Sequence, residues 1–223
     1  MKPEILFEDE HIIVCIKPAG IATQSSRIGT PDMVSLLKNH IAANSGHKKP
    51  PYLAVIHRLD QPVTGLLVFA KTPAAAKELN RQLQTYGFGK YYRAWLSGIP
   101  TSEEGELTDY LVKDGRTNMS RVCTADTPGA KKAELHYNIQ KTMSGCCLAE
   151  ITLKTGRHHQ IRVQMANMGC PIIGDRKYGN PAGTVVPEDV SSLLPSRTGL
   201  QLYACRLTFQ HPATKKSMLF ELP

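Results

Sequence analysis

VIHRLDQPVTG, at residues 55–65, joins two apolar runs of this 223-residue chain. The runs, YLAVI at 52–56 and LLVFA at 66–70, are short and rich in β-branched and aromatic residues, which predicts buried strands. Asp60 therefore lies on the connection between them, where a proline and a glycine restrict and turn the backbone. Connections held by a rigid scaffold often carry reactive side chains, but an aspartate at a turn also often serves only as a cap. This stretch alone favours neither interpretation.

A second segment favours the reactive interpretation. It reads LKTGRHHQIRVQM at 153–165 and continues with GCPIIGD at 169–175 and YG at 178–179. The segment is dense in cationic and amide donors, which are suited to an anionic ligand.

Together these segments resemble the RluA-type pseudouridine synthases, a family that isomerises uridines in ribosomal and transfer RNA. The motif HRLD-x-x-x-x-G is present at 57–65, GR-x-HQIR-V at 156–163 and G-x-PI-x-GD-x-x-YG at 169–179. KYYRA at 90–94 is similar to the family's K-x-Y-x-A strand, KPAG at 17–20 to its N-terminal turn, and residues 200–212 to its final strand. Six motifs in the expected order extend the resemblance over nearly the whole chain.

Helices and strands mix here without regular alternation, which predicts an α+β fold with a mixed, largely antiparallel sheet. Periodicity and capping signals predict flanking helices at 31–43, 73–86 and 160–168. Hairpin-forming strands are expected within 107–122 and 133–153, and a mobile loop at 181–199. The resemblance implies that this is the pseudouridine synthase fold, with an RNA-binding cleft across the sheet. We treat residues 1–223 as a single catalytic domain.

Composition fits a polyanionic partner. Lysine and arginine total 27 against 19 aspartate and glutamate residues, a formal net charge of +8. The chain has no apolar run of roughly 18 residues and no secretory leader, so we expect a soluble, cytoplasmic protein, and we expect it to be a monomer. Its six cysteines are scattered without C-x-x-C spacing and are expected to be reduced, mostly buried thiols. We assign no function to the adjacent pair Cys146 and Cys147.

The resemblance implies three catalytic residues. Asp60 matches the essential aspartate, which either attacks the sugar carbon or removes a neighbouring sugar proton. Arg162 matches the arginine that pairs with that carboxylate, although a phosphate contact is the alternative. Tyr92 matches the tyrosine that packs on the target base, whereas Tyr91 should face the other side of the strand. The isomerisation is redox-neutral, so no cofactor and no metal is expected.

Other residues are expected to contact RNA. The target uracil is expected to flip out of the RNA stack into a pocket of the protein. Arg58 should project toward the RNA and fill the gap that the base leaves, and Leu202 should close the pocket around the base. The expected phosphate-binding rim consists of Lys17, Arg157, His158, Lys154, Arg176 and Lys177. The chain departs from the common family pattern at His158, Gln164 and Tyr203. We expect a form of the family that starts directly at the catalytic domain, without the small N-terminal RNA-binding domain of many relatives.

Three other classes of protein fit the sequence less well. A metal hydrolase could recruit His57, Asp60, His158 and His159, but the sequence has no H-E-x-x-H or cysteine–histidine spacing. A glycoside hydrolase ordinarily needs two carboxylates, and only Asp60 lies in a motif here. A noncatalytic RNA-binding module is the stronger alternative, although binding alone would not need a carboxylate facing a polyanion.

Overall fold

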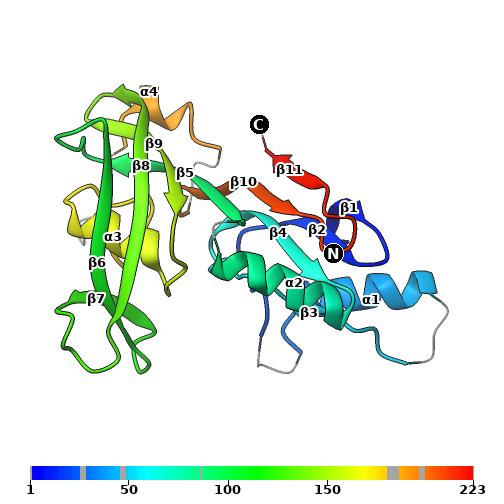
Figure 1. The fold of residues 1–223 in the computed structure, drawn as a ribbon. Coiled ribbons are helices and arrows are strands. Elements are labelled where there is room, and N and C mark those ends of the chain that lie inside the picture. The colour runs from blue at the N-terminus through cyan, green and yellow to red at the C-terminus, as the bar shows by residue number, and fades with distance from the viewer. Residues whose placement is uncertain are drawn as a thin grey trace. The chain divides into compact units, whose positions relative to one another are not determined.

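The chain folds as two units, one built from Met1–Lys90 with Ala204–Pro223 (unit 1) and the other from Tyr91–Tyr203 (unit 2). Figure 1 shows the ribbon of this computed structural model. The structure describes residues 2–25, 29–45, 49–85, 87–179, 186–195 and 199–222. A single catalytic domain over the whole chain stays a prediction.

Unit 1 contains a largely antiparallel sheet built on the apolar runs of the sequence. The strand order is β1 (Glu4–Glu8), β2 (Ile12–Lys17), β4 (Thr64–Ala70) and β10 (Leu202–Gln210), with β3 (Ala54–Val55) on β4 and β11 (Ser217–Glu221) on β10. In β4 every residue after the first is buried, as expected for a continuous apolar run. The sheet and α2 (Pro73–Gln84) enclose a core that includes Val14, Leu66, Leu79 and Phe209.

The helices of unit 1 begin at the capping signals of the sequence. In α2 the Thr72 side chain accepts the Ala75 N–H and proline occupies the first turn, which confirms the predicted start. The helix ends at Gln84, before the predicted glycine, because the Thr85 N–H already closes the last turn. The helix α1 runs over Met33–Ser45, and the Asp32 carboxylate accepts the Ser35 N–H at 2.7 Å.

The strand expected at 52–56 is shorter than predicted, because only Ala54–Val55 pairs with β4. Immediately afterwards the chain leaves the ladder, and the Val68 N–H of β4 points instead to the Nε2 of His57, at 3.4 Å. A side chain thus replaces the next backbone partner at the point where the Asp60 connection begins.

Unit 2 is dominated by long antiparallel strands (Figure 1). Their order is β5 (Gly89–Ser97), β9 (Cys146–Leu153), β8 (Lys131–Met143), β6 (Glu104–Asp114) and β7 (Met119–Cys123). The helix α3 (Gln160–Asn167) packs on one face through Val163, which contacts Leu111 of β6 and Ala133 of β8. Gly169 follows it with φ of +86°, which confirms the predicted stop.

The segment predicted as a mobile loop, 181–199, lies partly outside the described residues. Its described part contains a short helix, α4 (Glu188–Ser191), whose Val190 is fully buried against Trp95, Cys146 and Ile173. A loop alone was therefore wrong for this part, because the apolar Val190 has a core to pack against.

The prediction of an α+β fold with a mixed, largely antiparallel sheet and flanking helices is confirmed. The strand pairs β1–β2, β2–β4, β5–β9, β6–β8 and β8–β9 are all antiparallel, while a parallel bridge joins Ala22 and Asp32. All six cysteines are free, and five of them are buried. No helix among the described residues is long and apolar enough to cross a membrane.

Candidate active site

The connection that carries Asp60 is held by hydrogen bonds to the end of β2. The Gly20 N–H donates to the Gln61 carbonyl and the Gln61 side-chain amide donates to the Gly20 carbonyl, both at 2.8 Å. The Thr64 hydroxyl donates to the Lys17 carbonyl at 2.8 Å. Within the connection, the Val63 N–H donates to the Asp60 carbonyl at 3.0 Å. The backbone around Asp60 is therefore fixed on both sides.

Leu59 also fixes the connection that carries Asp60. Its N–H and its carbonyl both bond to the Thr23 hydroxyl, each at 3.1 Å, and both residues are buried. Burial then alternates, since Arg58 is exposed and Asp60 is half-buried. The exposed position of Arg58 is compatible with the predicted RNA contact, and the half-buried carboxylate keeps access to a ligand.

Gly65 ends the connection where no side chain fits. Its φ is +132°, and an added Cβ would lie 2.3 Å from the Ala204 carbonyl oxygen and 2.7 Å from the Ala204 nitrogen. These atoms belong to the backbone of the neighbouring strand β10, so they cannot move aside as a flexible side chain would. The glycine of the HRLD motif thus allows β4 and β10 to approach closely directly after Asp60.

Lys17 is the largest surprise of unit 1, because its side chain is fully buried. Its ammonium donates to the carbonyls of Pro18 at 2.9 Å, Ile21 at 2.7 Å and Gln61 at 3.1 Å. An ammonium has three donors, so none remains for a phosphate. Its predicted place in the phosphate-binding rim therefore has to be revised.

The charge of Lys17 acts on Asp60 instead. Burial lowers the Lys17 pKa to about 8, and the nearby Asp60 carboxylate opposes that decrease. Lys17 is thus a buried cation close to the predicted catalytic carboxylate, within the same unit. A lysine at a strand end is usually solvated, so charge alone could not identify this role; the signal was the otherwise apolar run IIVCIK at 12–17.

His57 lies at the start of the connection as a neutral acceptor. Its Nε2 accepts the Val68 N–H, and its ring contacts Phe88 edge to face at 5.5 Å between centroids. Burial, with the Lys90 charge as a second cause, lowers the His57 pKa to about 3. His57 therefore stays uncharged at neutral pH.

Tyr92 lies where the alternation of β5 predicts. It pairs with Ile151, which pairs with Tyr137 of β8, and this row shares the sheet face of Ala133, against which α3 packs. Tyr92 is buried, whereas Tyr91 points to the opposite face. The two tyrosines thus face opposite sides of the strand, as predicted, and the contact of Tyr92 with a base stays a prediction.

Arg162 of α3 forms a buried ion pair with Asp175. Its Nε and Nη2 donate to the two carboxylate oxygens, each at 2.7 Å, and the side chains are 5% and 0% exposed. Burial alone would raise the Asp175 pKa, but Arg162 and the backbone N–H groups of Lys177 and Tyr178 hold it below its usual value. The sequence contained Asp175 within the GD motif but gave no sign of this partner.

The other expected RNA contacts differ in their surroundings. Arg157 is exposed and its Nε donates to the Lys132 carbonyl at 2.7 Å, while the Lys177 ammonium donates to the Asn118 carbonyl at 2.8 Å. His158 is half-buried and bonds to the Ser120 hydroxyl at 2.9 Å. His158 and Arg157 directly precede α3, and this position is compatible with the predicted phosphate-binding rim.

Lys154 and Leu202 fit the predicted RNA site less directly. The Lys154 ammonium bonds to Glu106, whose pairing with His136 places it on the sheet face opposite α3. Lys154 is exposed, and its place in the phosphate-binding rim stays a prediction. Leu202 begins β10 and is buried, so it could line a base pocket or belong to the core.

Asp60 belongs to unit 1, whereas Tyr92, Arg162 and Leu202 belong to unit 2. The predicted pairing of Asp60 with Arg162 therefore stays a prediction. Among the residues that the structure describes, no group of three or more histidine, cysteine or acidic side chains is arranged to hold a metal ion.

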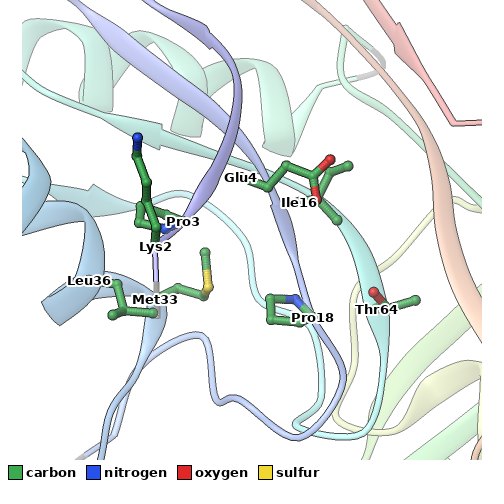
Figure 2. Close-up of a pocket in the computed structure, with 8 residues that line it drawn as sticks. All are labelled: Lys2, Pro3, Glu4, Ile16, Pro18, Met33, Leu36 and Thr64. Atoms are coloured by element: carbon green, nitrogen blue, oxygen red, sulfur yellow. The ribbon is translucent and has the colours of Figure 1, made fainter.

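A pocket of about 280 Å³ lies in unit 1, and its lining includes Thr64 from the end of the connection that carries Asp60. Figure 2 shows Met33 and Leu36 of α1 on one side and Ile16 and Pro18 on the other, and Thr64 also contributes to the lining. The lining is mostly apolar and includes none of the predicted catalytic residues.

Comparison with known proteins gives consistent results. A sequence model described as RNA pseudouridylate synthase matches residues 11–167. Ribosomal large subunit pseudouridine synthase D of Nitrosomonas europaea is 34% identical over 223 residues, which cover 99% of this chain and 61% of that protein. Dual-specificity RNA pseudouridine synthase RluA of Salmonella typhimurium is 35% identical over 221 residues, 98% of this chain and 92% of that protein.

Solved structures support the fold. Human RNA pseudouridylate synthase domain containing 4 superposes with a TM-score of 0.79 at 24% identity, covering 99% of this chain and 88% of that one. Human RNA pseudouridylate synthase domain containing 1 gives a TM-score of 0.70 at 20% identity, with 100% and 83% coverage.

Proposed function

This chain belongs to the RNA pseudouridylate synthase family, and we propose that it isomerises uridine to pseudouridine in RNA with Asp60 as the reacting carboxylate. The observation that carries the proposal is the Asp60 connection itself. Its backbone is fixed by Thr23, Gly20 and Lys17, while the carboxylate stays half-exposed beside a buried cation. Such a rigid, charged and accessible group is what catalysis at a sugar carbon requires.

The reaction conserves every atom of the uracil and the sugar. The bond between the base nitrogen and the sugar carbon breaks, the uracil turns, and carbon five of the base bonds to the same sugar carbon. Carbon five then releases its proton, and the freed ring nitrogen takes one up. An ionised Asp60 serves either route, attack on the sugar carbon or removal of the neighbouring sugar proton.

Two cations act on the Asp60 carboxylate in this proposal. Lys17 acts within unit 1, where the charges of Lys17 and Asp60 interact. Arg162 is the expected partner from unit 2, and its buried pair with Asp175 holds one edge of its guanidinium. Each would attract the negative charge of the carboxylate.

Access to a uridine in structured RNA requires the base to leave its stack, which costs a few kcal/mol of free energy. In the proposal Tyr92 stacks on the extruded uracil, a contact worth about 1–3 kcal/mol per base. Arg58, exposed two residues before Asp60, enters the space left by the base. Leu202 closes the base pocket.

Large-subunit ribosomal RNA is the first substrate to test, because the relative from Nitrosomonas europaea is named for it. Transfer RNA is a second candidate, and the monomeric state is part of the same proposal. The exposed Arg157, Arg176 and Lys177 would bind phosphates of either RNA, so the affinity should decrease with rising salt.

A noncatalytic RNA-binding module fits less well than an enzyme. Binding to a polyanion gains nothing from a carboxylate at the surface, and it needs no buried lysine beside that carboxylate. The burial of Lys17 lowers its pKa to about 8, which means that keeping the ammonium charged costs free energy in the folded protein. A buried cation with a shifted pKa beside a carboxylate is typical of a reactive site.

Tritium release tests the proposal. The protein is incubated with ribosomal and transfer RNA that carry tritium on carbon five of uracil, and tritium in water is counted. We expect release by the natural chain and by Asp126→Asn, whose carboxylate lies on the exposed turn before β8. Asp60→Asn should release at least about 10⁴-fold less. Activity retained by Asp60→Asn would remove Asp60 from this role.

A further inference from the structure

Tyr178 belongs to the YG motif, to which the proposed reaction assigns no role. Its ring lies against the guanidinium of Arg162, with 5.1 Å between the Arg162 Cζ and the ring centroid. We propose that Tyr178 is a positioning residue for Arg162, held in place by Ser120, His159 and His158. The proposal rests on the proposed function, in which Arg162 supplies a cation to Asp60.

The ion pair with Asp175 defines only part of the Arg162 geometry. Two parallel hydrogen bonds to one carboxylate fix an edge of the planar guanidinium. They restrain tilting of the plane less strongly, because both bonds lie in the plane of the group. A ring against the guanidinium face restrains that tilt through contact and through attraction between the cation and the aromatic face. Tyr178 supplies this second restraint.

Asp175 and Tyr178 are themselves connected. The same Asp175 oxygen that accepts from Arg162 Nη2 also accepts the N–H groups of Lys177 at 2.9 Å and Tyr178 at 3.2 Å. The carboxylate therefore fixes both the guanidinium and the backbone from which the tyrosine ring extends. Movement of either one disturbs the other.

The Tyr178 hydroxyl is fixed by two further elements. It accepts the Ser120 N–H of β7 at 2.7 Å, and it lies 2.7 Å from the Nδ1 of His159, directly before α3. The two rings meet edge to face, at 79° and 5.5 Å between centroids. His159 is buried and has a φ of +53°, a conformation that few residues other than glycine adopt. The local contacts thus hold a backbone that is unfavourable by itself.

His158 completes the arrangement. Its ring stacks on His159 at 3.8 Å between centroids, and its Nδ1 bonds to the Ser120 hydroxyl at 2.9 Å. Ser120 therefore contacts Tyr178 through its backbone and His158 through its side chain. The histidine at 158 stands at one of the positions where this chain departs from the common family pattern. Three segments, β7, the start of α3 and the 175–178 turn, are joined in one set of contacts that ends at Arg162.

A structural measurement tests the positioning directly. Hydrogen exchange of the arginine Nε–H groups is followed by ¹⁵N NMR, and the Arg162 signal is identified by its absence in Arg162→Lys. In the natural chain this proton should exchange slowly, since it is buried and bonded to Asp175. Tyr178→Leu should accelerate its exchange at least about tenfold. Tyr178→Phe, which keeps the ring, is the milder variant if Tyr178→Leu does not fold, and it should accelerate exchange roughly threefold.

Activity supplies the second test. Tyr178→Leu should lower kcat for tritium release about 100-fold with KM for RNA unchanged, because a misplaced cation affects the reacting carboxylate and not RNA binding. Tyr178→Phe should lower kcat roughly fivefold to tenfold. The control is Tyr110→Phe, since Tyr110 is half-buried on the sheet face opposite α3, and kcat should stay within about twofold.

A double-mutant cycle separates positioning from general damage. In the Arg162→Lys background, Tyr178→Leu should lower kcat by no more than about twofold further, since the group that it positions is already altered. Losses that multiply would overturn the proposal, as would unchanged Arg162 exchange in Tyr178→Leu and Tyr178→Phe. Failure of the natural chain to release tritium from any RNA would count against the proposed function alone, because the NMR measurement requires no activity.

Discussion

Lys17 in unit 1 and Arg162 in unit 2 are both buried cations, but the two units hold them in different ways. The Lys17 ammonium is surrounded by the backbone carbonyls of Pro18, Ile21 and Gln61. The Arg162 guanidinium is held by side chains, with Asp175 at its edge and Tyr178 at its face. One cation depends on the course of a loop, and the other depends on particular neighbouring residues.

This difference has energetic consequences. Lys17 is solvated by neutral dipoles, so removing it leaves no unpaired buried charge among its hydrogen-bond partners. Arg162 neutralises the carboxylate of Asp175, which is itself fully buried. Removing the arginine therefore leaves a buried negative charge without its ion-pair partner. We therefore expect the stability of unit 2 to be sensitive to its cation, and that of unit 1 to be sensitive to the backbone of its loop.

Arg162→Met should have the largest effect on stability. It should lower the free energy of unfolding by about 3–5 kcal/mol, because the Asp175 carboxylate loses its partner inside the protein. Urea unfolding at pH 7 measures this change. Arg157→Met is the control, since Arg157 is exposed, and it should stay within about 0.5 kcal/mol. A loss below about 1 kcal/mol for Arg162→Met would contradict the assigned dependence on the ion pair.

Gly65→Ala should have the next largest effect, of about 3 kcal/mol. The new Cβ would meet the Ala204 carbonyl oxygen at 2.3 Å, and the φ of +132° is unfavourable for alanine. The same unfolding experiment applies. Gly115→Ala provides the matched control, because no atom lies within 4 Å of its added Cβ, and it should change stability by less than about 1 kcal/mol. Equal effects of the two substitutions would argue against a loop fixed by its backbone.

Lys17→Met should separate activity from stability. Replacement removes the free-energy cost of burying the ammonium, but it also takes a donor from the carbonyls that Lys17 bonds. Because these effects oppose each other, the free energy of unfolding should change by no more than about 1 kcal/mol. Activity should nevertheless fall about 100-fold, because Asp60 loses a nearby cation. Lys77→Met, at an exposed position of α2, should change neither quantity. Instability as large as that of Arg162→Met would remove the distinction between the two cations.

The pH dependence gives the smallest expected effect on activity. Because the Lys17 pKa is about 8 in the fold and 10.5 as its ordinary value, the unfolded chain binds the extra proton between these limits. The Lys17 contribution to the free energy of unfolding should therefore rise from pH 8 to 10.5, while tritium release should decrease by about half between pH 7 and 8. A comparison of natural and Lys17→Met proteins measures both. Identical profiles would contradict a titrating Lys17.

The sequence was sufficient where local patterns determine the structure. Thr72 and the proline after it define the start of α2, and strand alternation places Tyr92 on the α3 face. The buried strand after Gly65 also follows from its apolar run. In each case a spacing of a few residues determines which side chains are buried.

The sequence was insufficient where partners lie far apart along the chain or where a charge is buried. The pair of Arg162 and Asp175 spans 13 positions and two different elements, and no periodicity connects them. Lys17 was expected to be solvated, since the energetic expense of burying lysine makes exposure the usual outcome.

Mapping of pseudouridine in a large-subunit ribosomal RNA transcript tests the central role of Asp60 most directly. The natural chain and Asp60→Asn are each incubated with the unmodified transcript, which is then labelled with carbodiimide and read by primer extension. The expected result is one or more new stops with the natural chain and none with Asp60→Asn, at equal RNA binding. Stops of equal intensity with Asp60→Asn would contradict a reaction that depends on this carboxylate.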